Sequence, residues 1–304
     1  MRSICQLERS GGYCMTLLDE MKPAVRRLRD GAGSLQQSAA HTLRQMTSGL
    51  RAWPDFVILG AQKAGTTSLY RYLTLHPRVA AAHVKEVHYF DLNLGRGPGW
   101  YRSNFPYRSA LGHGPTRRLT GEASPYYLFH PHCAKRIRAT LPEVALIALV
   151  RDPVARALSH YNHNLRNKRE TRSFAQALEE EDGLLEGEMR RMQSDPGYES
   201  FAVQHFSYKA RGRYAEQLER YFEVFGRDRV LVMRSEDLFS DPQRAFELTL
   251  AYLGLEPMQL GEFEQRNKGR YRRDEDPALA GLREYFSPHN ERLAQMLGQG
   301  PLWT

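Results

Sequence analysis

The residues best suited to chemistry lie in one glycine-rich stretch, GAQKAGTTS, which runs from Gly60 to Ser68. It lies between a short apolar run and a helical pattern, so backbone N–H groups at the start of the helix can bind an anion. The spacing from Gly60 to Gly65 matches the nucleotide-binding P-loop, but Thr66 stands where that loop needs a lysine, and the lysine is Lys63 instead. The stretch therefore predicts an anion site, with a generic glycine-rich turn as the alternative, and disfavours ordinary ATP or GTP hydrolysis.

Apolar runs alternate with helical patterns along the main part of the chain. Strands that are apolar at every position, and that alternate with helices, predict a parallel sheet covered on both sides. Polar residues 167–200 are predicted to form helix and loop bordering a cleft. The predicted strands are 56–59, 145–150 and 230–233, with 119–122 as a further candidate, and the predicted helices are 65–75, 153–166 and 242–253. The predicted fold is α/β, with a P-loop-like central parallel sheet and helices on both faces.

Charge and cysteine content limit the classes of function. The chain has 304 residues, a formal net charge of +8 and a pI near 9.4. A basic surplus favours anionic partners without choosing among them, although no nucleic acid is expected here. Cys5, Cys14 and Cys133 form neither a disulfide framework nor a zinc-binding spacing, which predicts a reducing compartment.

The N-terminal part differs in composition from the rest. Residues 1–50 are predicted to be a helical, partly mobile extension, and residues 54–304 to be one domain. No stretch of about 18 apolar residues predicts a membrane span. Asp19, Glu20 and Lys22 interrupt the start of the chain before an apolar signal-peptide core develops. These features predict a cytoplasmic protein and leave the oligomeric state open.

Two segments resemble motifs of one enzyme family. FVILGAQKAGTTSLYRYLTLHP, from Phe56, resembles the 5′-phosphosulfate-binding loop of sulfotransferases that use 3′-phosphoadenosine 5′-phosphosulfate (PAPS). LVRDPVARALSHY, from Leu149, resembles the segment of that family that binds the donor's 3′-phosphate. The resemblance runs from about residue 54 to the C-terminus and is greatest to the branch containing heparan sulfate sulfotransferases. Further matching segments are 85–91, 121–127, 268–271, 287–290 and 300–303.

The resemblance implies PAPS as sulfuryl donor, adenosine 3′,5′-bisphosphate as product, and no metal. Arg151 and Ser159 would hold the 3′-phosphate, on which both can converge if the chain turns from strand to helix between them. The planar fork of an arginine suits a phosphate. Taken singly, Arg151 is as well explained by an ion pair with Asp152, and Ser159 by a polar helix face. The implied donor-binding residues are Gln62, Lys63, Ala64, Gly65, Thr66, Thr67, Ser68, Arg151, Ser159, Lys268, Gly269 and Arg270.

The implied catalytic residues are Lys63, Glu86 and His88. Sulfuryl transfer resembles phosphoryl transfer, in which the protein mainly positions groups and neutralises charge. Lys63 would contact the bridging oxygen, where negative charge grows as the S–O bond breaks, and Glu86 would accept the acceptor's proton. His88 would lie on the same side as Glu86 if this stretch is extended. The alternative is a surface ion pair between Lys85 and Glu86, followed by two core aromatic residues.

One position departs from the pattern of the heparan 3-O-sulfating enzymes. Those enzymes carry a lysine just before a Ser-Pro or Thr-Pro pair, whereas this chain has Ala123. A cation is therefore missing beside the reaction centre or is supplied elsewhere, with Lys85 as a candidate. The expected acceptor is a saccharide or small metabolite with a hydroxyl or amine. An acidic acceptor would be favoured if basic residues face the cleft; the candidates are Arg190, Arg191, Lys209, Arg211 and Arg213.

Two other functions are compatible with part of the pattern. A P-loop nucleoside or sugar kinase would require a Gly-Lys-Thr/Ser order and a strand-end aspartate for magnesium, and the first is absent. A non-catalytic nucleotide-binding relative would keep the fold without the chemistry, but Lys63, Glu86, Arg151 and Ser159 are all present. A PAPS-dependent sulfotransferase is therefore the favoured interpretation.

Overall fold

The computed structural model of the chain describes residues 43–261 and 278–303. The chain divides after Gly49 into two compact units, and the second contains the sheet. In the first unit, the Thr47 hydroxyl is within hydrogen-bonding distance of the carbonyl oxygens of Leu43 and Arg44, at 3.1 Å each. The helical extension predicted for residues 1–50 lies mostly outside the described residues, and the predicted domain boundary stays a prediction.

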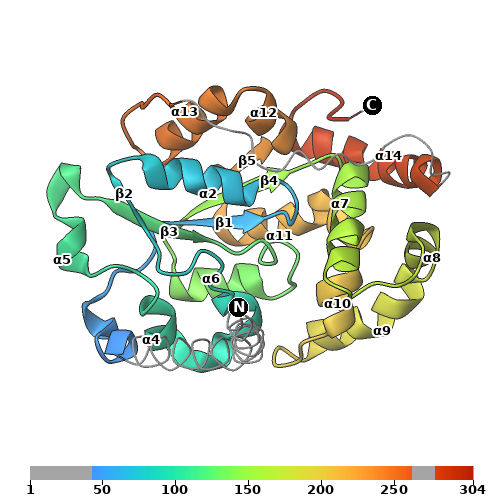
Figure 1. Ribbon diagram of the computed structural model, residues 1–304, viewed down its shortest axis with the longest axis horizontal. Helices are drawn as coiled ribbons and strands as arrows, with labels where there is room; N and C mark the ends of the chain where they lie inside the picture. Colours follow the sequence, from blue (N-terminus) through green and yellow to red (C-terminus); the bar gives the residue numbers. More distant parts are fainter. Residues whose placement is uncertain (1–42, 262–277, 304) are drawn as a thin grey trace, which may run out of the picture. The chain divides into compact units, whose positions relative to one another are not determined.

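A five-stranded sheet forms the centre of the second unit, with all strands parallel in the order β2-β3-β1-β4-β5 (Figure 1). Its strands are β1 (Phe56–Gly60), β2 (Val79–Ala81), β3 (Leu119–Ala123), β4 (Ala145–Val150) and β5 (Val230–Arg234). All of β1 and all but the first residue of β4 are buried. The continuous apolar runs thus correspond to strands covered on both faces, and the predicted α/β fold is confirmed.

The helices fill the connections between strands and the C-terminal part of the chain. They are α2 (Thr66–Leu75), α3 (Tyr89–Leu92), α4 (Gly97–Arg102), α5 (Arg108–Leu111), α6 (Cys133–Thr140), α7 (Pro153–Arg166), α8 (Phe174–Glu179), α9 (Glu181–Ser194), α10 (Phe201–Phe206), α11 (Tyr214–Phe225), α12 (Ser235–Ser240), α13 (Pro242–Tyr252) and α14 (Ala278–Leu297). Short 3₁₀ turns lie at Ser48–Leu50, Leu94–Arg96, Gly114–Thr116, Ala210–Gly212 and Arg227–Arg229.

The direction of the connections places helices on both faces of the sheet. The chain leaves β1 through α2 towards β2, and later crosses from β3 through α6 back over β1 to β4. Right-handed connections that run in opposite directions put their helices on opposite faces, as Figure 1 shows for α2 and α6. The connections that follow β1 and β4 diverge, so the carboxyl ends of these two neighbouring strands border the crevice in which such sheets bind ligands.

Several elements were not predicted from the sequence, among them the strand β2 and the helices α6, α11, α12 and α14. β2 has only three residues, two of them alanine, which is a weak strand former. α12 lies between β5 and the predicted helix at 242–253, and its six residues are too few to show a clear helical period. The segment 167–200 contains α8 and α9, in agreement with the prediction of helix and loop.

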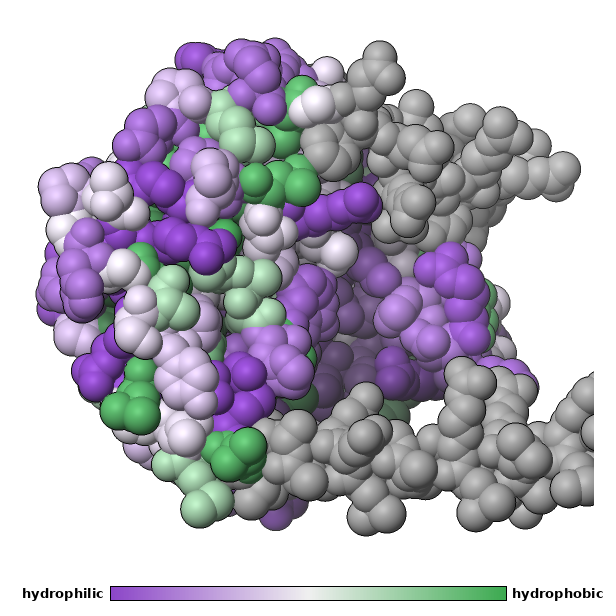
Figure 2. Space-filling model, turned by 60° about the vertical axis from the view of Figure 1, so that its left-hand side comes forward, coloured by the Kyte–Doolittle hydropathy of each residue, from purple (hydrophilic) through white to green (hydrophobic). Residues whose placement is uncertain are grey.

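Hydrophilic side chains dominate the face of the molecule seen in Figure 2. They cover most of that face and gather in a hollow, while hydrophobic side chains are scattered. Among the helices of the described ranges, none is long and apolar enough to span a bilayer.

Candidate active site

The stretch from Gly60 to Gly65 forms a tight turn between β1 and α2. These two glycines have φ values of 149° and 92°, which residues with side chains rarely adopt. A Cβ at Gly60 would lie 2.6 Å from the carbonyl oxygen of Pro125, and a Cβ at Gly65 would lie 2.9 Å from the ring of Phe239. Both positions require glycine for space as well as for backbone conformation.

The N-terminus of α2 is open to an anion. Its N-cap residue is Gly65, and no side chain caps the helix. The amides of Ala64 and Ser68 donate to carbonyl oxygens of the loop. Among the described residues, no hydrogen bond uses the amides of residues 65–67. These three donors, together with the helix dipole, provide the positive end that an anion such as a phosphate requires.

Lys63 lies in the loop with a left-handed backbone conformation, at a φ of 72°. Burial, followed by the charge of Arg166, lowers the pKa of Lys63 to about 8, while Glu86 opposes the change and Arg151 and Lys85 add to it. Four cationic side chains and one carboxylate are thus close enough to influence one another. This excess of positive charge is what a bound multivalent anion would neutralise.

The second predicted phosphate motif meets the first at Lys63. Arg151 directly follows β4, and its Nη1 donates a hydrogen bond of 2.8 Å to the carbonyl oxygen of Lys63. The hydroxyl of Tyr214 donates a 2.9 Å bond to the carbonyl oxygen of Arg151, which fixes the turn. The two segments predicted to bind opposite ends of one donor therefore lie side by side.

The other residues predicted to bind the 3′-phosphate are not joined to Arg151 in this way. Ser159 lies two turns into α7 and is 7% exposed. Asp152 caps α7, because its Oδ1 accepts a 3.0 Å hydrogen bond from the amide of Val154. Lys268, Gly269 and Arg270 lie outside the described residues.

Glu86 and His88 come together at a turn and not on an extended strand. His88 has a φ of 52°, and α3 begins directly after it, so the expectation of an extended stretch is wrong at this residue. Nε2 of His88 lies 3.5 Å from Oε2 of Glu86, and Nδ1 lies 2.7 Å from Oδ2 of Asp91. Asp91, which the sequence did not identify, thereby fixes the orientation of the imidazole ring.

Hydrogen bonds hold Glu86 and His88 in their charged forms. Burial favours the neutral form of Glu86, but hydrogen bonds from His88 and Lys85 outweigh burial and lower the pKa of Glu86 to about 2. Burial likewise opposes the charge of His88, but bonds to Asp91 and Glu86 raise the pKa of His88 to about 10. A carboxylate with so low a pKa is a weak base, so Glu86 needs to lose one of these partners before it can accept a proton efficiently.

Lys85 links Glu86 to the anion loop. Its Nζ forms an ion pair with Oε1 of Glu86 and donates a 2.8 Å hydrogen bond to Oγ1 of Thr67 in the first turn of α2. Its carbonyl oxygen accepts a 3.1 Å bond from the amide of Ala123 at the end of β3. The ion pair predicted as an alternative to a catalytic role is therefore present, and it belongs to the same charged cluster as Lys63.

A buried carboxylate, Glu122, supports the turn that carries His88. Glu122 is fully buried in β3, and its Oε2 accepts hydrogen bonds from Ser124 Oγ at 2.7 Å and the amide of Val87 at 3.3 Å. Ser124 Oγ in turn accepts a 3.0 Å bond from the amide of His88. Hydroxyls of Tyr101 and Tyr127 complete the set, at 2.6 and 3.1 Å from Oε1. The end of β3 thus sets the position of the candidate base.

Only one of the five basic residues proposed from the sequence as cleft cations contacts the anion loop. Arg211 is 3% exposed, and its Nη1 donates a 2.8 Å bond to Oε1 of Gln62. The other four lie against partners elsewhere: Arg190 with Glu186, Arg191 over the ring of Tyr198, Lys209 with Asp182, and Arg213 with Glu216.

Besides Arg151 and Lys85, two further basic groups near Lys63 lie on α7 and were not identified from the sequence. Arg166 exerts the largest charge effect on Lys63. Burial and the charges of Lys63, Arg166 and Arg169 lower the pKa of His163. Burial and the charges of Arg169, Arg211 and His163 lower that of His205 to about 4. The helical periodicity of α7 places Arg166 close to His163 on one face, but only the fold shows that this face meets the loop.

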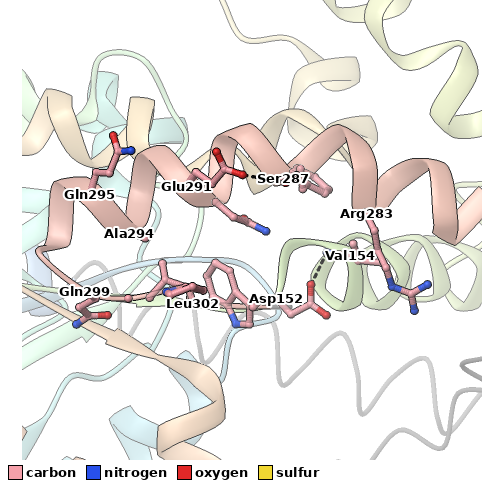
Figure 3. Close-up of a pocket in the computed structure, with 14 residues that line it drawn as sticks. Asp152, Val154, Arg283, Ser287, Glu291, Ala294, Gln295, Gln299 and Leu302 are labelled. Carbon is pink, nitrogen blue, oxygen red and sulfur yellow. Dashed lines mark hydrogen bonds between the residues drawn. The ribbon is translucent and has the colours of Figure 1, made fainter.

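A separate cavity of about 440 Å³ lies between α14, the C-terminal segment and the turn after β4. Figure 3 shows Arg283, Ser287, Glu291 and Gln295 along one face of α14, opposite Asp152 and Leu302. None of the predicted donor-binding or catalytic residues lines this cavity within the described ranges. It shares only the turn at Asp152 with the charged cluster.

Comparisons of the sequence and of the structure with known proteins both find sulfotransferases. A family model described as the sulfotransferase domain matches residues 53–266. The membrane-associated sulfotransferase kil1 of Dictyostelium discoideum is 27% identical over 315 residues, covering 82% of this chain, which spans 66% of that relative's length. Human heparan sulfate glucosamine 3-O-sulfotransferase 6 is 28% identical over 337 residues, covering 96% of this chain and 88% of that protein. A crystal structure of a sulfotransferase from Alicyclobacillus acidocaldarius is 31% identical, with a TM-score of 0.62, and covers 82% of this chain and 97% of that one.

Proposed function

Because this chain belongs to the sulfotransferase family, we propose that it transfers the sulfuryl group of PAPS to a hydroxyl or amine of an anionic acceptor, a saccharide or small metabolite. The observation that carries the proposal is the contact between Arg151 and the carbonyl oxygen of Lys63. It brings the two phosphate motifs together at the carboxyl ends of β1 and β4.

The residues of the loop suit a doubly phosphorylated donor. The open N-terminus of α2 and the Thr66 and Thr67 hydroxyls would hold the 5′-phosphosulfate. Arg151 would hold the 3′-phosphate, together with Ser159 and the predicted segment 268–270. The mutual repulsion that helps to lower the pKa of Lys63 is relieved when an anion binds among these cations, and this gain favours binding.

The proposed transfer divides the chemistry between donor and protein. Bound PAPS supplies the sulfuryl group: a bond forms from the acceptor oxygen or nitrogen to sulfur, and the bond from sulfur to the 5′-phosphate oxygen breaks with its electron pair on that oxygen. Lys63 neutralises the charge that grows on the leaving oxygen. Glu86 takes the proton of the acceptor, while His88, oriented by Asp91, holds Glu86 in place.

The anionic acceptor is inferred from the charges that extend beyond the loop. Lys63, Arg166 and His163 lie close enough to affect one another's ionisation, and Arg169 connects this group to His205 on α10. Phe201, which is 60% exposed, packs against His205 with 4.3 Å between ring centroids. The charged side chains of Arg166 and Arg169, near the neutral imidazole of His205 and the exposed ring of Phe201, suit a sugar ring or another small scaffold that carries carboxylate, sulfate or phosphate groups.

Donor binding tests the reaction class. Isothermal titration should show that adenosine 3′,5′-bisphosphate binds without magnesium and more tightly than ATP with magnesium. The opposite order would favour a kinase. Labelled PAPS incubated with a panel of acceptors should then give sulfated product; tight binding of the bisphosphate with no product from any acceptor would favour the non-catalytic alternative.

Acceptor charge is tested with one substitution and one control. Arg169→Glu should raise the KM for acidic acceptors several-fold while leaving the KM for the donor unchanged. Lys135→Glu makes the same charge change at an exposed position of α6 and should leave both constants unchanged. Equal activity of wild type and Arg169→Glu on acidic acceptors would contradict the acceptor assignment without affecting the donor assignment.

A further inference from the structure

We propose that Lys85 is a catalytic residue shared between the base and the donor: it pairs with Glu86 before the donor binds, and moves onto the sulfuryl oxygens when the donor binds. This inference rests on the proposed function. The handover makes Glu86 a competent base only once a sulfuryl group is in place.

The position of the Lys85 ammonium carries the proposal. Nζ pairs with Oε1 of Glu86 and also lies 2.8 Å from Oγ1 of Thr67, so it stands between the candidate base and the first turn of α2. The main chain of Lys85 is held by the amide of Ala123, whereas its side chain is 27% exposed and extends from a segment without regular structure. The ammonium can therefore move by rotation of side-chain bonds while its backbone stays fixed.

Charge explains why the ammonium would move. Before the donor binds, Glu86 is the carboxylate among the main charges of the described residues that act on Lys63. A sulfuryl group in the loop adds negative oxygens beside Thr67, where no other side-chain cation is hydrogen-bonded in the described structure. Thr67 Oγ1 already accepts a hydrogen bond from Lys85, so the hydroxyl proton of Thr67 is available for a hydrogen bond to an oxygen of PAPS. The bond from the ammonium polarises the hydroxyl and strengthens this second hydrogen bond.

The two lysines would then have different tasks. Lys63 would act at the oxygen that leaves with the 5′-phosphate, and Lys85 at the oxygens that travel with sulfur. Ala123 at the end of β3 is fully buried and contributes no charge. Lys85 supplies a cation from the neighbouring segment, to which Ala123 is hydrogen-bonded.

Loss of Lys85 would change the surroundings of Glu86 in a predictable way. The groups that face Glu86 are Lys85 and His88 on its own segment, Lys63 on the loop and His163 on α7. When Lys85 is replaced by a neutral residue, His88, Lys63 and His163 still face Glu86. The pKa of Glu86 in the free enzyme should therefore rise from about 2 towards its ordinary value when Lys85 is replaced.

Donor affinity gives the first test. Lys85→Met should bind PAPS at least tenfold more weakly than the wild type, as expected for loss of a hydrogen bond to a charged group, while binding adenosine 3′,5′-bisphosphate equally well. Thr67→Val should also reduce the affinity for PAPS relative to that for the bisphosphate. The fold-loss of PAPS affinity in the double variant should be smaller than the product of the two single fold-losses. Lys135→Met, at an exposed position of α6, should change neither the affinity for PAPS nor that for the bisphosphate. Equal loss of PAPS and bisphosphate affinity in Lys85→Met would overturn the proposal.

The pH dependence of the two specificity constants gives the second test. The kcat/KM for PAPS reports the enzyme before the donor binds, so its acid limb should move to higher pH in Lys85→Met. The kcat/KM for the acceptor at saturating PAPS reports the complex from which Lys85 has already left Glu86, so its acid limb should not move. A fixed ion pair would move both limbs, and that result would overturn the handover. If Lys85→Met melts below the wild type, Lys85→Gln provides the same comparison.

These measurements separate the inference from its premise. Binding of PAPS and of the bisphosphate can be compared without any acceptor. A wild type that binds PAPS but sulfates no acceptor would remove the proposed function, whereas a wild type that turns over and a Lys85→Met that keeps the PAPS preference would remove only the role of Lys85.

Discussion

Arg151 donates a hydrogen bond of 2.8 Å from Nη1 to the main-chain carbonyl oxygen of Lys63, a residue 88 positions earlier in the chain. The bond joins the turn after β4 to the loop after β1, whose strands are neighbours in the sheet. A group that binds at Arg151 therefore acts directly on the backbone of the residue whose ammonium faces the reacting bond in the proposed transfer.

Arg151→Ala should weaken the binding of adenosine 3′,5′-bisphosphate by about 1.5–3 kcal/mol, because a bidentate cation is lost from the 3′-phosphate. Isothermal titration measures this directly. Arg229→Ala, which removes an exposed arginine paired with Glu143, is the matched control and should leave the affinity unchanged. Unchanged affinity in Arg151→Ala would exclude this arginine from the donor site.

Lys63→Met should abolish transfer, with a loss of at least about 10²–10³-fold in kcat, because the leaving oxygen loses its cation. Its melting temperature at pH 7 should not fall, since the substitution removes a half-buried charge that lies among other cations. Circular dichroism and turnover are measured on the same sample. Turnover like that of the wild type would contradict the role of Lys63.

The kcat/KM for PAPS should decline as the pH rises through about 8, because Lys63 must be protonated to act and its pKa in the free enzyme is lowered to that value. Lys63→Arg keeps the charge well above this range and should lose the alkaline limb, even where its maximal rate is lower. The pH profile of kcat/KM for PAPS measures both. Persistence of the limb in Lys63→Arg would assign it to another group.

Glu86→Gln should lower kcat while leaving the affinity for adenosine 3′,5′-bisphosphate unchanged, because the amide cannot accept the acceptor's proton and does not touch the donor's phosphates. Glu143→Gln, at an exposed site, is the control and should be fully active. An undiminished rate in Glu86→Gln would place the base elsewhere.

Two buried carboxyls, Glu122 and Glu181, should each contribute less to the free energy of unfolding as the pH rises from about 4.5 to 7. Burial raises the pKa of Glu122 to about 7, and that of Glu181 to about 7 as well. Between its unfolded pKa of 4.5 and its folded pKa of about 7, each of these carboxyls binds more protons in the folded state than in the unfolded state. The stability that each contributes at the lower pH is therefore lost as the pH rises, by on the order of 2 kcal/mol for each group. Glu181→Gln should remove its contribution, so the melting temperature of the variant relative to the wild type should rise with pH in this interval. A difference that does not change with pH would contradict the assignment to Glu181.

The sequence predicted those parts of the fold that local patterns determine. β1 and β4 are continuous apolar runs bounded by turns. The glycines of the loop between β1 and α2 predict a tight turn there. The turn at His88 could not be predicted, because it accompanies hydrogen bonds from the amides of His88 and Val87 to Ser124 and Glu122, which are distant in sequence. Periodicity carries no information about such partners.

The candidate site was predicted to a similar extent. The contact of Arg151 with Lys63 agrees with the predicted meeting of two motifs. The roles of Lys63, Glu86, His88 and Ser159 stay predictions, as does the cytoplasmic location. Among the basic residues, composition alone could not separate Arg190, which pairs with Glu186 on an exposed helix face, from Arg166, which influences Lys63. Only the course of α7 past the loop distinguishes them.

The close packing at Gly60 couples the anion loop to the segment that follows β3. The backbone after β1 touches the carbonyl of Pro125 so closely that not even a methyl group fits between them. Pro125 follows the strand end that holds the turn of His88 in place. A shift of the loop would therefore press on the segment that holds the turn of His88, so that movement of the anion loop and movement of the candidate base are coupled by direct steric contact.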